Sequence, residues 1–231
     1  MKSLAHVVAF LAAANLFAAD PIQREKGVIY LSDFLTEPMR LNVLAPAPAY
    51  FSLSGQRYVG TLRVPQAVEV QAISDKAYRI RGRAQQGMIL GWVSPSYLEK
   101  IPEETLERLR ASEERRVEVE ALIAEGEVAI GMTVDEVQRR LGKPQKKTTR
   151  KSRDEAPEQI WDYVKYKSVP QYTNVVGPNG VVSVATTYVK TPVGKLTVTF
   201  RDGIVESIDQ SEGTILEGTT TTVAPPITVF W

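Results

Sequence analysis

The segment from Ile130 to Pro144 limits the fold more than any other part of the chain, because it marks both ends of a short helix. Thr133, followed three residues later by Glu136, forms a capping box in which each side chain accepts a hydrogen bond from the other residue's backbone N–H. Gly142 stands where a left-handed conformation ends a helix, and Pro144 prevents its continuation. The apolar residues between them share one helical face: Val134, Val137 and Leu141. A helix of about eight residues is too short to be stable alone, so it must pack against other elements.

Strands and tight turns are expected after this helix. The expected strands cover residues 159–167, 181–190, 195–201 and 204–209. Gly177-Pro178-Asn179-Gly180 supplies a turn after the first strand, and Asp202-Gly203 is a strong hairpin signal between the last two. A helix followed by consecutive antiparallel strands predicts an α+β layer.

A long helix is expected between this region and the part of the chain before it. Pro102 suits the first helical position, and Glu103 and Glu104 in the first turn interact favourably with the helix dipole. No Gly or Pro interrupts the sequence until Gly126. At about 1.5 Å per residue such a helix spans roughly 35 Å. It either separates two modules or packs on one of them, and the sequence leaves both possibilities open.

Residues 40–98 have a different pattern. Short alternating runs occur, such as those over residues 68–72 and 78–81; Pro65 precedes the first of these and Gly87 follows the second. Short alternating strands with such punctuation predict a small β-barrel. Residues 20–39 have a mixed composition, and we expect them to begin as a loose segment.

The segment from Gly87 to Leu98 reads Gly-Met-Ile-Leu-Gly-Trp-Val-Ser-Pro-Ser-Tyr-Leu and resembles the closing strand of a bacterial Src-homology-3-like (SH3-like) barrel. In peptide-binding barrels of this type, aromatic side chains near the closing strand line the groove. The resemblance therefore makes Trp92 and Tyr97 candidate partner-binding residues. The alternative is that Trp92 simply packs in the barrel core.

The downstream half resembles the BamE-like family (SmpA/OmlA), the small subunit of the outer-membrane barrel-assembly machinery. The resemblance rests on Gly131-Met132-Thr133, Val137, Leu141-Gly142-Lys143-Pro144, Trp161-Asp162-Tyr163 and Leu196-Thr197-Val198-Thr199-Phe200 with the Asp-Gly hairpin after it. It extends from Ile130 to Asp209. Family members are usually short lipoproteins, whereas this chain has no Cys and carries a preceding barrel and an extra segment over Val169–Val184. The resemblance therefore implies the fold more strongly than the role.

These observations predict a mixed β and α+β chain: a small SH3-like β-barrel, a connecting helix, and a BamE-like helix with an antiparallel sheet. The expected units are a signal peptide over residues 1–19, the barrel over 40–100, the connecting helix over 101–127, the BamE-like α+β domain over 128–209 and a Thr/Pro-rich tail over 210–231. The tail composition is typical of an extended, poorly packed segment. Its apolar end is expected to add a strand to a sheet edge, either its own or a partner's.

The N-terminus has the order of a secretory signal. Lys2 is followed by an apolar run over residues 4–14, and small residues at Ala18 and Ala19 offer a cleavage site. We therefore expect an exported protein, periplasmic or associated with the outer membrane, although an uncleaved anchor is the alternative. Because the chain lacks the cysteine that anchors bacterial lipoproteins, we do not expect a lipoprotein.

Composition narrows the possible chemistry. Removal of residues 1–19 takes away His6, the single His, and leaves the Lys and Arg residues equal in number to the 27 Asp and Glu residues. A neutral chain disfavours nucleic acid as a partner. A chain without His or Cys lacks the usual nucleophile systems and zinc ligands. We therefore expect no enzyme activity, no catalytic residues, no metal and no cofactor. A carboxylate pair remains as an alternative, although Asp135 and Glu136 suit a helix start.

A basic run extends from Arg139 to Arg153 without an acidic residue. One interpretation is a solvated loop that pairs with the Glu-rich helix before it. The other is contact with anionic lipid or an acidic partner, and the association of the BamE-like family with anionic phospholipid favours it. The candidate residues for an anionic surface are Lys146, Lys147, Arg150, Lys151 and Arg153.

Three functional hypotheses follow. The first is a non-enzymatic envelope protein that binds other proteins or peptides as an adaptor, in outer-membrane protein assembly or envelope maintenance. The second is a protein that binds peptidoglycan or acts as a secreted inhibitor, because the BamE-like fold also resembles secreted β-lactamase inhibitory proteins. The third is an enzyme that uses carboxylates. The sequence leaves the partner and the oligomeric state open.

Overall fold

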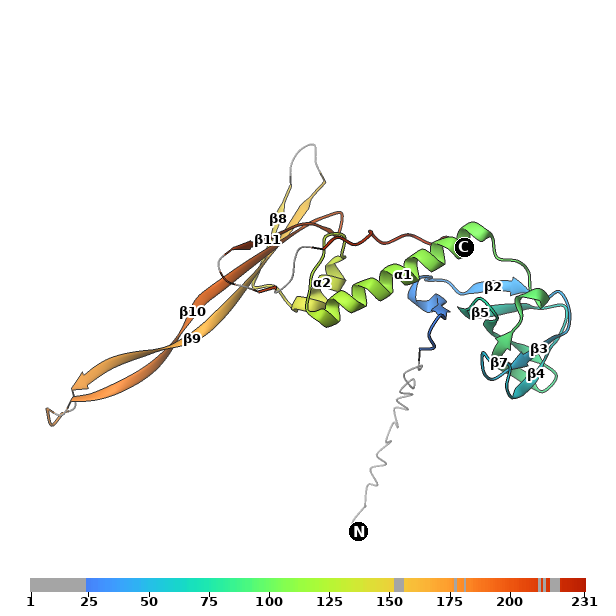
Figure 1. The fold of residues 1–231 in the computed structure, drawn as a ribbon, viewed down its shortest axis with the longest axis horizontal. Helices are drawn as coiled ribbons and strands as arrows, with labels where there is room; N and C mark the ends of the chain where they lie inside the picture. The colour runs from blue at the N-terminus through green and yellow to red at the C-terminus, as the bar shows by residue number, and fades with distance from the viewer. Residues whose placement is uncertain are drawn as a thin grey trace, which may run out of the picture.

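The computed structural model describes residues 24–151, 156–176, 178–180, 182–211, 213, 215–216 and 221–231. These residues form two antiparallel sheets and two α-helices, with one helix running between the sheets (Figure 1). The predicted mixture of β and α+β structure is confirmed. None of the described helices is long and apolar enough to cross a membrane.

The first sheet has seven strands in the order β1-β5-β6-β4-β3-β7, with β2 paired to β5 and a further pairing of β6 with β7. Inward-facing side chains alternate with exposed ones along β2 and β6 and form the first core, which includes Leu41, Leu62 and Ile80. The strands are β1 (Ile29–Tyr30), β2 (Met39–Asn42), β3 (Ala47–Tyr50), β4 (Tyr58–Leu62), β5 (Ala67–Ile73), β6 (Tyr78–Ala84) and β7 (Gly87–Val93).

Residues 24–27 are exposed and belong to no strand, as expected for the start of this segment, but the chain from Val28 onward is part of the fold. β1 pairs with the end of β5, where Tyr30 lies opposite Ala72. Val28 and Leu31 are both buried, and a short 3₁₀ helix follows over Leu31–Asp33. Val28 and Tyr30 pack with Ala72, Ala77 and Trp92 in a small third cluster.

The predicted long helix is α1 (Glu103–Glu125), although Pro102 lies just before its first helical position; the helix ends at Gly126, which has the left-handed conformation (φ 91°). Leu109 is buried in the first core, and Val119 is buried in a second core, which the other sheet forms. The helix therefore spans the two cores and packs on both, so the two possibilities that the sequence left open are combined.

Helix α2 (Val134–Leu141) confirms the capping box. The backbone N–H of Thr133 donates to Glu136 Oε2 at 2.8 Å, and the backbone N–H of Glu136 donates to Thr133 Oγ1 at 3.3 Å. Gly142 ends the helix with φ 75°. Val137 is fully buried in the second core, so this short helix is held by packing, as expected for its length.

The second sheet has the order β11-β10-β9-β8. Trp161, Leu196, Val198 and Phe200 form much of the second core beneath α2, and the Trp161 and Phe200 rings lie 4.8 Å apart. The strands are β8 (Lys146–Arg150), β9 (Glu158–Val176), β10 (Val182–Arg201) and β11 (Ile204–Ser211). The predicted Asp202-Gly203 hairpin joins the last two strands.

The expected strand boundaries in this sheet need correction. β8 was not expected, and β9 extends to Val176 instead of ending near residue 167. Two of the expected strands are one continuous β10, in which Pro192 and Gly194 mark only an irregularity in the pairing. Residues that usually interrupt a strand are tolerated here because the ladder can absorb one extra residue.

Residues 221–231 of the tail are extended and mostly exposed, as the composition predicts, but two buried valines anchor them to the fold. Thr222 forms an isolated parallel bridge with Ile130, and Val223 is buried in the second core. The chain then follows α1 (Figure 1), and Val229 is buried in the first core. Apart from the single bridge, residues 221–231 add no strand to a sheet. They connect the two cores, as α1 does.

Candidate binding surfaces

The most exposed part of the molecule is a two-stranded projection, which we call the arm: residues 166–176 of β9 and 182–193 of β10. β8 pairs only with residues 158–162 and β11 only with residues 195–201, so the arm strands have only each other as neighbours in the described structure. All side chains that the structure describes in the arm are exposed. Figure 1 shows the arm directed away from α1 of its own chain.

One face of the arm carries its three tyrosines. Tyr172 pairs with Thr186, and Tyr188 pairs with Pro170. Because side chains alternate along a strand, Tyr166, Tyr172 and Tyr188 share one face. They are 52%, 71% and 70% exposed, respectively. We call this the tyrosine face, which consists of Tyr166, Tyr172, Tyr188, Val176, Val182 and Val184.

The arm has no acidic residue, and no Asp or Glu occurs between Asp162 and Asp202. Its charges are those of Lys167 and Lys190. A two-stranded hairpin alone is marginally stable in water, and large exposed apolar patches mark interaction sites. The arm therefore has the properties of a docking element for an apolar surface with negative charge.

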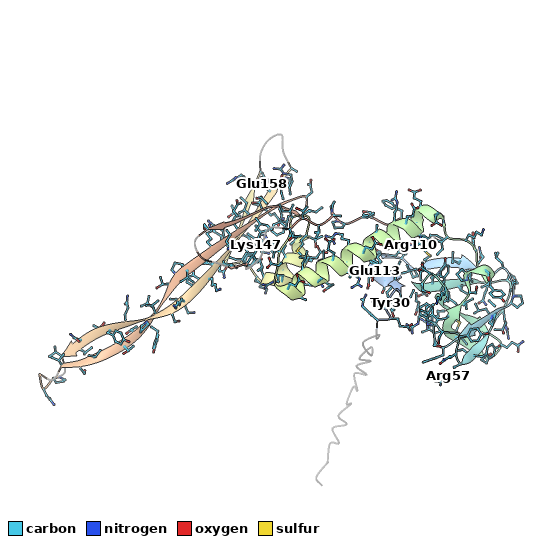
Figure 2. The ribbon with its side chains drawn as sticks, viewed as in Figure 1. Tyr30, Arg57, Arg110, Glu113, Lys147 and Glu158 are labelled. Carbon is cyan, nitrogen blue, oxygen red and sulfur yellow. The ribbon has the colours of Figure 1, made fainter. Side chains whose placement is uncertain are left out.

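A groove of about 390 Å³ lies between α1 and the first sheet. Its apolar lining includes Ile29, Ile73 and Leu106, and burial raises the pKa of Tyr78 beside them. The charged lining is mainly acidic, because Asp75, Glu113 and Glu114 face one arginine, Arg110. Arg110 lies 3.7 Å from Asp75, and Figure 2 labels Arg110 and Glu113 on α1.

The predicted basic cluster lies partly on edge strand β8. Lys147 Nζ lies 4.1 Å from the centroid of the Trp161 ring, and Arg150 lies 3.7 Å from Glu158; Figure 2 labels Lys147 and Glu158 on this sheet. Lys146 and Lys151 are exposed, and Arg153 lies outside the described residues. Lys147 and Arg150 thus stabilise the sheet locally, and basic residues on an edge strand also hinder pairing with other chains. Binding of an anionic surface stays a prediction.

The two predicted aromatic site residues are not equally accessible. Trp92 is only 3% exposed and packs with Val28, Tyr30 and Ala77, as in the alternative interpretation. Tyr97 is half-buried against the first core. Trp92 therefore offers almost no surface to a partner, and partner binding by Tyr97 stays a prediction.

Arg115 forms a buried junction that sequence reasoning missed. It donates two hydrogen bonds to the Glu136 carboxylate at 2.7 and 2.9 Å, one to the Gly131 carbonyl at 3.0 Å and one to the Ala224 carbonyl at 2.6 Å. Burial alone would raise the pKa of Glu136, but the bonds from Arg115 and Thr133 hold it below its ordinary value. No sequence signal distinguishes Arg115 from the other arginines of a Glu-rich helix.

Glu136 therefore serves as a helix cap and as the partner of Arg115, which agrees with the structural interpretation of the Asp135–Glu136 pair. No His, Cys, Asp and Glu side chains gather as a potential metal site within the described part of the chain.

No family model, curated protein or solved structure matches the sequence or the fold. The SH3-like and BamE-like resemblances accordingly stay predictions.

Proposed function

We propose that this chain is a non-enzymatic, exported protein of the cell envelope that binds other proteins as an adaptor. The arm is the observation that carries the proposal. It exposes three tyrosines and several valines on a two-stranded ribbon without acidic residues. Such a ribbon gains stability when a partner covers it, so docking is the role that its chemistry supports best.

The position in the envelope is supported by sequence resemblance. The N-terminal signal pattern supports export. The SH3-like and BamE-like resemblances support a barrel and an α+β module of kinds that bind other molecules, in outer-membrane protein assembly or envelope maintenance. The connection of both cores through α1 and the tail supports a scaffold that holds two binding modules in a fixed relation.

A second candidate function is binding of the cell wall or of anionic lipid. The exposed side chains of Lys146, on edge strand β8, and Lys151, directly after it, favour this function, although Lys146 also lies opposite Asp162 of β9. Both peptidoglycan and anionic lipid carry negative groups that such side chains attract. Sedimentation with purified cell walls and flotation with vesicles of anionic or neutral lipid distinguish these ligands.

The adaptor role is tested by affinity purification from gently solubilised envelopes. The bait is the full-length protein, compared with a variant that removes the tyrosine face: Tyr166→Ser, Tyr172→Ser and Tyr188→Ser. The control carries Val169→Ser, Gln171→Ser and Val189→Ser on the opposite face of the arm. We expect envelope proteins to be recovered with the bait and the control and lost with the tyrosine variant. Equal recovery with all three proteins would contradict the adaptor role of the arm.

A further inference from the structure

The tyrosine face is large enough to be a docking site. A tyrosine side chain offers about 150–250 Å² of surface. At the exposed fractions of 52%, 71% and 70%, the three rings together leave roughly 290–480 Å² open to solvent on one face. The largest apolar patch on a typical monomer covers about 300–600 Å² and is often functional, so the tyrosine face has the size of an interaction site.

The exposed side of α1 has the complementary character. Glu107, Glu114, Glu118 and Glu125 are exposed along it, and none of the four forms an ion pair with a described basic residue. Val117, which is 54% exposed, lies among them. The acidic groove between α1 and the first sheet borders this side through Glu114. The surface is therefore acidic with apolar interruptions, whereas the arm is apolar with basic residues.

The two surfaces also have the same length. Helix α1 has 23 residues and spans about 35 Å at 1.5 Å per residue. Residues 166–176 of the arm span roughly 35 Å at about 3.3 Å per residue. The arm points away from α1 of its own chain (Figure 1), so it cannot cover that helix without a large change in direction.

We propose that the arm docks on a second copy of this chain, with the tyrosine face along α1 of the other copy. The tyrosines cover Val117 and the apolar lining of the groove. Lys190, on the tyrosine face, lies near the exposed glutamates, and Lys167, on the opposite face, adds to the positive charge of the arm. A two-fold axis makes the contact reciprocal, so each copy contributes one arm and one helix.

The area supports a reciprocal dimer. Each copy buries its tyrosine face and, through its own α1, an area of similar size. The sum approaches the roughly 800 Å² per partner of a stable protein interface. A single arm–helix contact falls short of that area, which favours the reciprocal arrangement over a chain of one-sided contacts.

Sedimentation of the full-length protein tests the dimer. We expect a dimer for the unchanged protein and for the control with Val169→Ser, Gln171→Ser and Val189→Ser. The variant with Tyr166→Ser, Tyr172→Ser and Tyr188→Ser is expected to raise the Kd of dimerisation at least about tenfold, because central aromatic residues dominate interfaces. A monomer at all concentrations of the unchanged protein would overturn the proposal, and so would a dimer with the same Kd in all three proteins.

Charge exchange separates a lost contact from a damaged fold. We expect Glu114→Lys with Glu118→Lys, and separately Lys167→Glu with Lys190→Glu, to weaken dimerisation. A mixture of these two proteins should form heterodimers more tightly than either forms homodimers. Failure of the mixture to recover association, with both proteins folded by circular dichroism, would contradict the arm–helix contact.

Cross-linking locates the contact, since the sequence contains no cysteine. Tyr172→Cys and Val117→Cys proteins are purified separately, mixed, and treated with a short thiol-to-thiol cross-linker. We expect a cross-linked heterodimer, and none when Gln85→Cys, at the exposed tip of the β6–β7 hairpin, replaces Val117→Cys. Cross-linking with the Gln85→Cys protein alone would refute the placement on α1.

The inference rests on the proposed function only in treating the arm as a docking element, and the two fail in different ways. If the protein is monomeric but the tyrosine variant loses envelope proteins in the purification, the dimer is refuted and the adaptor role stands. If neither sedimentation nor purification changes with the tyrosine variant, both are refuted.

Discussion

Replacement of Arg115 by Met tests whether one buried guanidinium holds α1, α2 and the tail together. The substitution keeps an apolar stem but removes four hydrogen bonds, two of them to the Glu136 carboxylate. Removing one partner of a buried ion pair typically costs 3–5 kcal/mol, because the other charge stays buried without compensation. The Glu136 side chain is 16% exposed, and water can therefore reach it, so we expect a cost of about 3 kcal/mol.

Urea unfolding followed by tryptophan fluorescence measures this cost, and calorimetry should show Tm lower by roughly 6–12 °C. Arg116→Met, one residue further along α1, is the matched control. Arg116 pairs with Glu113 three residues earlier on a partly exposed face, and such pairs contribute less than about 1 kcal/mol. The tail should also become more sensitive to protease near Ala224 in the Arg115→Met protein. Equal destabilisation by Arg115→Met and Arg116→Met would refute the junction.

Three further predictions concern the second core. Gly131→Ala should lower the free energy of unfolding by at least about 1 kcal/mol more than Gly203→Ala does. Both glycines have positive φ, but only the Cβ added at Gly131 collides with another atom, the Val223 carbonyl oxygen. Equal unfolding midpoints of the two variants in urea would contradict this. Thr133→Ala should cost about 0.5–2 kcal/mol through loss of the helix cap, and Ser at the same position should recover most of it in the same assay. The pKa values of Glu136 and Asp162 lie below their ordinary values despite burial, because Arg115 bonds to the first and Thr197 and Lys195 bond to the second. The two carboxylates therefore stabilise the fold above their unfolded pKa near 4, and this stabilisation is lost as the pH falls through their lower folded pKa values. The difference in Tm between the unchanged protein and a variant with Glu136→Gln and Asp162→Asn should shrink as the pH is lowered from about 7 to about 3. A difference that stays constant over this range would refute the prediction.

Local signals in the sequence were reliable where a few neighbouring residues decide the conformation. The capping box at Thr133, the helix between Pro102 and Gly126 and the Asp202-Gly203 hairpin all occur where they were predicted. In each case a side chain or a glycine satisfies or frees backbone groups within a few residues. Such signals act between residues close in the chain, so they can be read from the sequence before the packing partners are known.

The candidate sites were harder to predict because exposure depends on distant residues. Trp92 is covered by Val28 and Tyr30 from a segment expected to be loose. Part of the basic run became strand β8 only because β9 offers it a pairing edge, with Lys146 opposite Asp162. The sequence alone contains the donors and acceptors but not the partner strand.

What the sequence by itself determined is the set of local elements: a β-rich first half, a long helix, a capped short helix and a run of antiparallel strands. Only the tertiary structure decided that β9 and β10 continue as an arm past their neighbours, that the tail connects both cores, and that Arg115 meets Glu136 and Ala224. The physical reason is the range of the interactions. Capping and turn formation act over a few residues of chain, whereas burial and strand pairing depend on which surfaces meet, and that is settled only when the whole chain packs.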